Sequence, residues 1–174
     1  MTDNEALTMI RDKEEIRDLV LLYSRGVDRQ DFALLRTLYT VDGHDDHAGV
    51  FSGSATDYVA FLERSLPYLH MSGHYVCNHL ISVDGDTGEG EVYALAHHIF
   101  PDGKGGMIED RAGVRYIDQY RREAGCWRFS SRIVTFDFRE TRPIPVPDRP
   151  TPVAAEDPSY TALSMRLFGR GRRA

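Results

Sequence analysis

The sequence predicts an α+β fold, in which about three N-terminal helices pack on one face of a curved antiparallel sheet. Two observations support this. Helical periodicity fills most of the chain before Pro67, and long alternating strand patterns follow from Met71 to Phe138. Helices followed by a run of antiparallel strands are typical of α+β folds, with the helices on one face of the sheet. A chain of 174 residues is long enough for one domain with a sizeable core.

The first helix is expected from about Leu7 to Val27, because apolar residues recur there at steps of three and four. Asp31 can cap a short second helix. Ser54 opens a third helix, with the spacing of a capping box to Asp57. Asp28 falls at the C-terminal end of the first helix, where the helix dipole disfavours a carboxylate. Its position therefore needs a reason.

The first long strand begins near His74 and ends in the turn Asp84-Gly85, a strong hairpin signal. Strict alternation places His74 and Asn78 on one face and His79 on the other. Further strands are expected in ranges 88–100, 107–121 and 126–138, after an irregular strand in 41–53. An imidazole and a carboxamide on one strand face indicate either a chemical site or an exposed polar face.

Composition excludes several classes of function. The net charge of -6 is offset by no basic stripe, which argues against nucleic acid as a partner. Cys77 and Cys126 have neither metal-ligand nor redox spacing. The polar N-terminus lacks the apolar core of a secretory signal, and no apolar window could cross a membrane, so a cytoplasmic location is expected. No dinucleotide fingerprint, P-loop or nucleophile elbow is present, so no cofactor is expected.

Seven histidines make a metal site worth weighing. The segment His44 to His47 and the pair His97-His98 supply nitrogen and oxygen donors. Adjacent histidines on a strand diverge, however, and no His-x-His pair occurs. The expected reading of His44 to His47 is a polar strand edge, and no metal is expected.

The C-terminal segment differs in composition from the rest. Six of the eight prolines lie between Arg142 and Pro158, which predicts an extended arm outside the sheet. Tyr160 to Phe168 could form a short helix. We therefore expect a domain over residues 1–140 and a proline-rich arm over 141–174. Because such arms commonly wrap around a neighbouring subunit, a homo-oligomer is expected, either a dimer or a trimer.

Several motifs occur together in this chain. Tyr-x-x-x-x-Asp spans Tyr23 to Asp28, and His-x-x-x-Asn-x-x-Ile-x-x-Asp-Gly-Asp spans His74 to Asp86. They are followed by Arg-Tyr-x-Asp-x-Tyr and Trp-Arg-Phe-x-x-Arg in ranges 115–120 and 127–132. Over residues 8–140 the chain thus resembles the SnoaL-like branch of the NTF2-like superfamily, which contains dehydratases and a dehydrochlorinase. The resemblance implies a cone-shaped bent sheet wrapped over helices, enclosing an apolar pocket.

The resemblance also implies site residues. Lyases of this branch pair a histidine of the first long strand with an aspartate at the end of the first helix, which correspond to His74 and Asp28. An assisting tyrosine corresponds to Tyr23. One lyase of this branch, a bile-acid dehydratase, has a second acidic residue that falls near His97, where this chain differs. We therefore expect His74, Asp28, Tyr23 and His97 to be catalytic.

A His–Asp pair in an apolar pocket is suited to removing a proton from carbon, because the carboxylate orients the imidazole and stabilises its charged form. Loss of hydroxide would complete a dehydration, and return of the proton elsewhere an isomerisation. The expected substrate is a hydrophobic polycyclic or aromatic small molecule. The expected substrate-binding residues are Arg132, Asn78 and Tyr116.

Other readings stay open for individual residues and for the chain. Tyr23 could be a core tyrosine, Asn78 a structural hydrogen-bond partner, and Arg132 the partner of an acid on the sheet surface. The chain could also be a non-catalytic NTF2-like module, similar to the small subunit of ring-hydroxylating dioxygenases.

Overall fold

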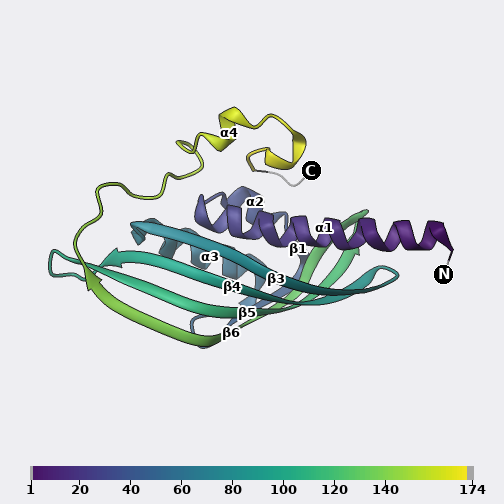
Figure 1. Ribbon diagram of the computed structural model, residues 1–174, viewed down its shortest axis with the longest axis horizontal. Helices are drawn as coiled ribbons and strands as arrows, with labels where there is room; N and C mark the ends of the chain where they lie inside the picture. The colour runs from purple at the N-terminus through teal and green to yellow at the C-terminus, as the bar shows by residue number, and fades with distance from the viewer. Residues whose placement is uncertain (1, 172–174) are drawn as a thin grey trace.

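Three helices precede the main strands, as the periodicity predicts (Figure 1). The computed structural model describes residues 2–171. The helices are α1 (Asp3–Asp28), α2 (Phe32–Arg36) and α3 (Ala55–Ser65), the last followed by a 3-10 turn, η1 (Leu66–Tyr68). The predicted caps Asp31 and Ser54 are confirmed, each accepting a backbone hydrogen bond. α1 starts earlier than expected because Thr2 forms a capping box with Glu5.

The sheet has six strands in the order β2-β1-β6-β5-β4-β3. Their bounds are β1 (Tyr39–His47), β2 (Ser52–Ser54), β3 (Met71–Asp84), β4 (Thr87–Pro101), β5 (Met107–Glu123) and β6 (Cys126–Ile144). β3 to β6 form the expected antiparallel meander. The expectation of a wholly antiparallel sheet is wrong at one place, because β1 pairs in parallel with β6. No hairpin joins these two strands, so no tight turn fixes their relative direction.

Tight turns hold the meander together. Gly85, between β3 and β4, has a φ of +55°. Ala124 and Gly125, between β5 and β6, have φ values of 52° and 79°. Two consecutive residues with positive φ make the turn whose twist matches that of antiparallel strands. The predicted hairpin at Asp84-Gly85 is confirmed.

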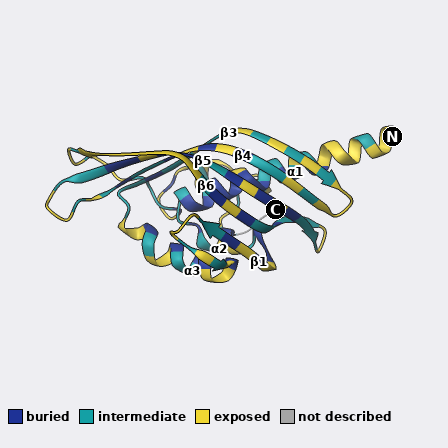
Figure 2. Ribbon diagram, turned by 90° about the horizontal axis from the view of Figure 1, so that it is seen from below, coloured by how far each residue is buried: buried dark blue, intermediate teal, exposed yellow. Residues whose placement is uncertain are grey.

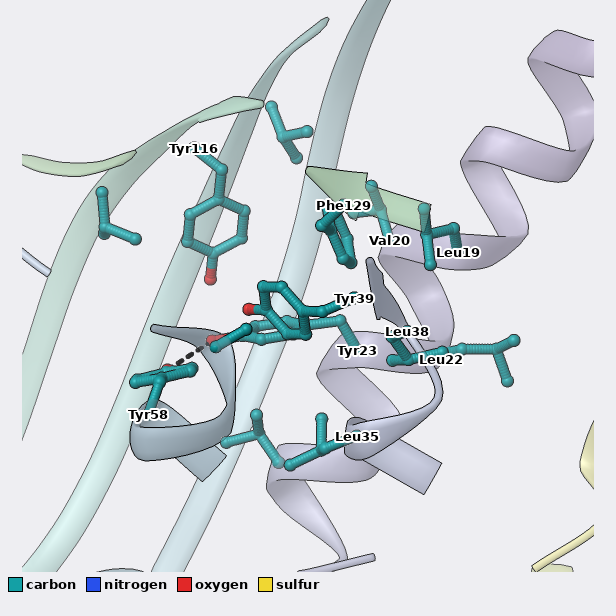
Figure 3. Close-up of a cluster of buried hydrophobic side chains, with 14 of the residues drawn as sticks. Leu19, Val20, Leu22, Tyr23, Leu35, Leu38, Tyr39, Tyr58, Tyr116 and Phe129 are labelled. Carbon is teal, nitrogen blue, oxygen red and sulfur yellow. Dashed lines mark hydrogen bonds between the residues drawn. The ribbon is translucent and has the colours of Figure 1, made fainter. Parts of the chain in front are cut away.

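The helices lie against one face of the curved sheet, and the core fills the space between them (Figures 1 and 2). Much of this core is aromatic. Trp127 and Phe129 are fully buried on β6, and Tyr23 of α1 meets Tyr116 of β5 and Phe129 edge-on. Figure 3 shows several of these tyrosine hydroxyl groups turned toward one another, and it draws the rings of Tyr23, Tyr39, Tyr58, Tyr116 and Phe129. The concave side therefore combines apolar packing with phenol groups.

The end of the sheet lies beyond the expected boundary at residue 140. β6 continues to Ile144, where it pairs with Met107 of β5. Pro143 lies inside this strand, although the prolines were expected to keep the arm out of the sheet. It is tolerated because β1 pairs with β6 only as far as Val134, which leaves the later part of β6 at an edge.

The remaining arm folds back on its own chain (Figure 1). The backbone N–H of Ala154 donates to the carbonyl of Arg29 at 2.7 Å, and Asp157 pairs with the Arg29 guanidinium. Arg25 lies 4.2 Å from the ring centroid of Tyr160. The expected helix over 160–168 is present only as two short turns, α4 (Ser159–Ala162) and η2 (Arg166–Phe168). The arm thus covers the C-terminal end of α1.

No helix among residues 2–171 is long and apolar enough to span a membrane.

The ion pair between Arg132 and Asp118 is completely buried. Arg132 of β6 donates two hydrogen bonds of 2.7 Å to the carboxylate of Asp118 on β5, and neither side chain is exposed. The Arg132 guanidinium also lies 4.1–4.3 Å from the ring centroids of Tyr23, Tyr116 and Phe129. The carboxylate raises the pKa of Arg132 against the opposing effect of burial. Two charges are held in the core by this geometry.

We expect Asp118→Asn to lower the free energy of unfolding by about 3–5 kcal/mol, because it leaves the Arg132 charge buried and uncompensated. Urea unfolding followed by tryptophan fluorescence measures this. The matched control is Asp137→Asn, which removes one carboxylate partner of the partly exposed Arg115 and leaves the other, Glu91. It should change stability far less. Equal effects of the two substitutions would contradict the stabilising role of the buried pair.

Candidate active site

The structure brings Asp28 and His74 together. Asp28 is the last residue of α1, and His74 lies on β3. The Nδ1 atom of His74 is 2.6 Å from Asp28 Oδ1, and the backbone N–H of His74 donates to Oδ2 at 2.9 Å. The hydroxyl of Ser72 donates to Oδ1 at 3.0 Å. These hydrogen bonds stabilise the negative charge that the helix dipole disfavours at this end of α1.

The hydrogen bonds decide the charge of Asp28. Burial raises the pKa of this carboxyl group. The hydrogen bonds from His74 and Ser72 and the nearby imidazole lower it by more than burial raises it, so the pKa lies below its usual value. Asp28 is therefore a carboxylate at neutral pH. It accepts the Nδ1–H of His74, which leaves the lone pair on Nε2.

A bulge in β3 sets which side chains face the helices. The register shifts between Val76 and Asn78, so Cys77 is an extra residue in the pairing with β4. A single extra residue moves every later side chain to the opposite face. His79 consequently turns inward and lies 3.0 Å from the Tyr120 hydroxyl. Asn78 is exposed on the outer face, so its predicted place in the site is wrong, as is the outward position expected for His79.

His74 lines an apolar cavity of about 260 Å³ between the helices and the concave side of the sheet. Its apolar wall comes from α1, α3, η1 and β4 and includes Val27, Phe61, Leu62, Leu66, Leu69 and Phe100. Five polar aromatic side chains also line it, namely Tyr23, His47, Tyr58, His74 and His98. Asp110 and Arg139 also line the cavity, as a hydrogen-bonded ion pair in which Asp110 is buried and Arg139 half exposed.

The expected position of His97 in the cavity is wrong, and its neighbour His98 lines the cavity instead. His98 lies two residues from Ala96, which pairs directly with His74, so both histidines are on the concave face. Their ring centroids are 5.3 Å apart. His97 faces the outer side of the sheet, where its Nε2 is 2.9 Å from Glu109. The exposed residues Tyr93 and Leu95 share the alternation of His97, and that pattern could have indicated its outward direction.

The predicted substrate ligands Arg132 and Tyr116 are core residues that do not line the cavity. Arg132 pairs with an acid, as the alternative interpretation held, but this acid is the buried Asp118 and not a group on the sheet surface. Tyr116 is 2% exposed, and burial raises its pKa. Its hydroxyl points toward the side chains of Tyr23, Tyr39 and Tyr58 (Figure 3).

Tyr23 is a core tyrosine that also lines the cavity. It is 2% exposed within the core, and its hydroxyl is 2.6 Å from that of Tyr58 at the cavity (Figure 3). Burial raises the pKa of Tyr23 and of Tyr58 above the usual value for a phenol. Both are therefore neutral hydroxyl groups that can donate a hydrogen bond.

The sequence interpretation missed a second histidine–carboxylate pair. The expected polar strand edge holds Asp45, which is fully buried, and His47, whose Nδ1 contacts Asp45 Oδ1. The other oxygen of Asp45 accepts a 2.6 Å hydrogen bond from Tyr39. Alternation along β1 places Asp45 and His47 on one face and leaves His44 exposed. That alternation was the available signal.

No group of three or more His, Cys, Asp or Glu side chains within residues 2–171 is arranged to hold a metal ion.

The chain matches a known protein family over most of its length. The model of the SnoaL-like domain matches residues 8–133. An uncharacterised protein of Mycobacterium tuberculosis is 26% identical over 133 residues, which make up 75% of this chain and 89% of that protein.

Solved structures agree with this assignment. A type 2 hexachlorocyclohexane dehydrochlorinase superposes with a TM-score of 0.71 at 19% identity, covering 82% of this chain and 98% of its own. A candidate scytalone dehydratase from Novosphingobium aromaticivorans gives 0.66 at 17% identity, covering 90% and 99%. At these identities the likeness shows the fold alone. The family match means that the chain belongs to the SnoaL-like domain family, and its fold is that of a solved NTF2-like protein at 20% identity and a TM-score of 0.58.

Proposed function

We propose that this protein is a cofactor-independent lyase, in which His74 removes a proton from a carbon next to an activating group. The main support for this proposal is the His74–Asp28 pair at the wall of an apolar cavity. Asp28 accepts Nδ1–H, fixes the imidazole tautomer and stabilises the imidazolium formed when Nε2 takes the proton. Water-poor surroundings strengthen this electrostatic effect. The lyase names of the similar structures support the proposal.

The cavity suggests the size and character of the substrate. A dry cavity of roughly 150 Å³ accommodates benzene, so about 260 Å³ suits one ring or two fused rings. Its wall is largely aliphatic and phenylalanine side chains, which favours a hydrophobic substrate. The polar groups gathered at His74 and at Tyr23 can orient a ring that carries a carbonyl and a leaving group. We propose an aromatic or bicyclic ketone of this kind.

An isomerase would use the same dyad, since proton removal is common to both reactions. The two differ in the second step, which either expels a leaving group or returns the proton to another carbon. Loss of water from the substrate therefore distinguishes them. A protein that only binds the ring would catalyse neither step.

The first test uses β-hydroxyindanone, a bicyclic ketone that loses water to give indenone, with the product followed by absorbance. We expect His74→Gln and Asp28→Asn to lower kcat by about 10²- to 10⁴-fold, the usual contribution of a positioned base. The matched controls are Asn78→Ala and His97→Gln. Asn78 lies on β3, as His74 does, and His97 lies on the neighbouring β4, but both face the outer side of the sheet. Activity of His74→Gln equal to the wild type would contradict the proposal.

The neighbouring His98 should remain neutral at the pH of catalysis. Burial lowers its pKa to about 4, and nearness to His74 adds to this effect. The unfolded chain takes up this proton near pH 6.5, so His98 favours the folded state less as the pH falls from about 6.5 toward 4. In a ¹⁵N-resolved NMR titration, the His98 ring signals should not shift between pH 8 and 5.5. Assignment comes from their loss in His98→Gln, and a midpoint near 6.5 would contradict the prediction.

We also propose a homo-oligomer, either a dimer or a trimer. Several large apolar side chains are exposed on the outer face of the sheet, among them Tyr75, Leu95 and Phe138, which are 56%, 47% and 50% exposed. Contiguous exposed apolar surface is typical of interaction sites. Size-exclusion chromatography with light scattering should give two or three times the chain mass of 19.7 kDa. A monodisperse monomer would contradict it.

A further inference from the structure

The second histidine–carboxylate pair reaches the same cavity as His74. Asp45 is fully buried, with one oxygen at His47 Nδ1 and the other accepting the Tyr39 hydroxyl at 2.6 Å. Both oxygens are therefore engaged, and the carboxylate holds the His47 ring. His47 itself is partly exposed, since 19% of its side chain is accessible, and it lines the cavity.

The other nitrogen of His47 begins a chain of hydroxyl groups. His47 Nε2 is 3.0 Å from the Tyr58 hydroxyl and 3.5 Å from the Tyr23 hydroxyl. These two hydroxyls are themselves 2.6 Å apart (Figure 3). Because both tyrosines line the cavity, the chain from Asp45 through His47 ends at the place where a ligand would bind.

The His74–Asp28 and His47–Asp45 pairs lie toward opposite edges of the sheet, yet both histidines line one cavity because the sheet is curved. β3, which carries His74, is one edge of the sheet, and β1, which carries His47, is next to the opposite edge. A ligand in the cavity could therefore meet one imidazole from each direction. The surroundings of the two rings differ. Two phenol oxygens can accept the Nε2–H of a protonated His47, whereas His74 has the imidazole of His98 beside it.

We propose that His47, held by Asp45 and acting through Tyr58 and Tyr23, is the acid that protonates the leaving group. This inference rests on the proposed function. Hydroxide is a poor leaving group unless it is protonated, and in the proposed reaction His74 acts as the base that takes up a proton. A positioned acid on the other side of the ring supplies that proton.

The step balances without any oxidant or reductant. The C–H bond next to the carbonyl breaks, His74 Nε2 takes the proton, and the electron pair forms the carbon–carbon double bond. The carbon–oxygen bond breaks, and the departing oxygen takes the Tyr23 proton. Tyr23 regains a proton from Tyr58, and Tyr58 from His47. One water leaves, and proton exchange with solvent returns His74 and His47 to their starting states.

The test compares two probes that differ only in the leaving group. β-Hydroxyindanone must expel hydroxide, which needs a proton, and β-chloroindanone expels chloride, which does not. In His47→Gln the ratio of kcat for the hydroxy probe to kcat for the chloro probe should fall by about 10²-fold or more. In His74→Gln both rates should fall together and leave the ratio unchanged. The matched control is His44→Gln, since His44 is exposed on the same strand.

Two further measurements guard against a merely structural effect. Tyr58→Phe keeps the ring and removes only the hydroxyl, so it should lower the same ratio as His47→Gln. The fall of kcat at alkaline pH on the hydroxy probe, which reports the protonated acid, should disappear in His47→Gln. Thermal melting of each variant shows whether the fold is retained.

The outcomes separate the two proposals. A wild-type ratio in both His47→Gln and Tyr58→Phe would overturn the acid role, while loss of both activities in His74→Gln would still support the lyase. A wild-type protein that acts on neither probe would overturn the lyase, and the acid role with it.

Discussion

The Asp28 carboxylate joins the end of α1 to β3, and much of the molecule depends on this contact. It accepts hydrogen bonds from the backbone and ring of His74 and from Ser72. A carboxylate is unfavourable at a helix C-terminus, so these bonds must stabilise its charge. They fix the edge strand of the sheet to the longest helix and orient the imidazole in the same step. The fold and the proposed chemistry therefore share one set of hydrogen bonds.

The buried Arg132 is the second charged group that stabilises the concave side of the sheet, after Asp28. Two hydrogen bonds to Asp118 compensate its charge, and the rings of Tyr23, Tyr116 and Phe129 surround the guanidinium. Cations lie favourably over aromatic faces, more so when they are desolvated. Since Tyr23 also reaches Tyr58 and the cavity, Arg132 stabilises the position of a side chain that the proposed reaction uses. It supports the site from behind the cavity wall.

The C-terminal arm adds a further constraint on α1. Its contacts at Arg29 and Arg25 lie within one turn of Asp28. The arm is outside the segment matched by the SnoaL-like family model, which ends at residue 133. The segment matched by the family model therefore holds the two histidine–carboxylate pairs, while the C-terminal arm covers the helix end that carries Asp28.

Periodicity and turn chemistry in the sequence determined the order of helices and strands, the caps at Asp31 and Ser54 and the Asp84-Gly85 hairpin. These features are local, since each depends on residues within a turn or two. The resemblance to SnoaL-like proteins added the pairing of Asp28 with His74, which are 46 positions apart. The tertiary structure alone decided which side chains face the cavity. One extra residue at Cys77 reversed the faces of Asn78 and His79, and the pairing of β3 with β4 selected His98 over His97. The tertiary structure also showed that Arg132 is buried with Asp118, and that His47, paired with Asp45, lies beside Tyr58. Strand register and the curvature of the sheet set these directions, and both arise from contacts between segments far apart in the chain.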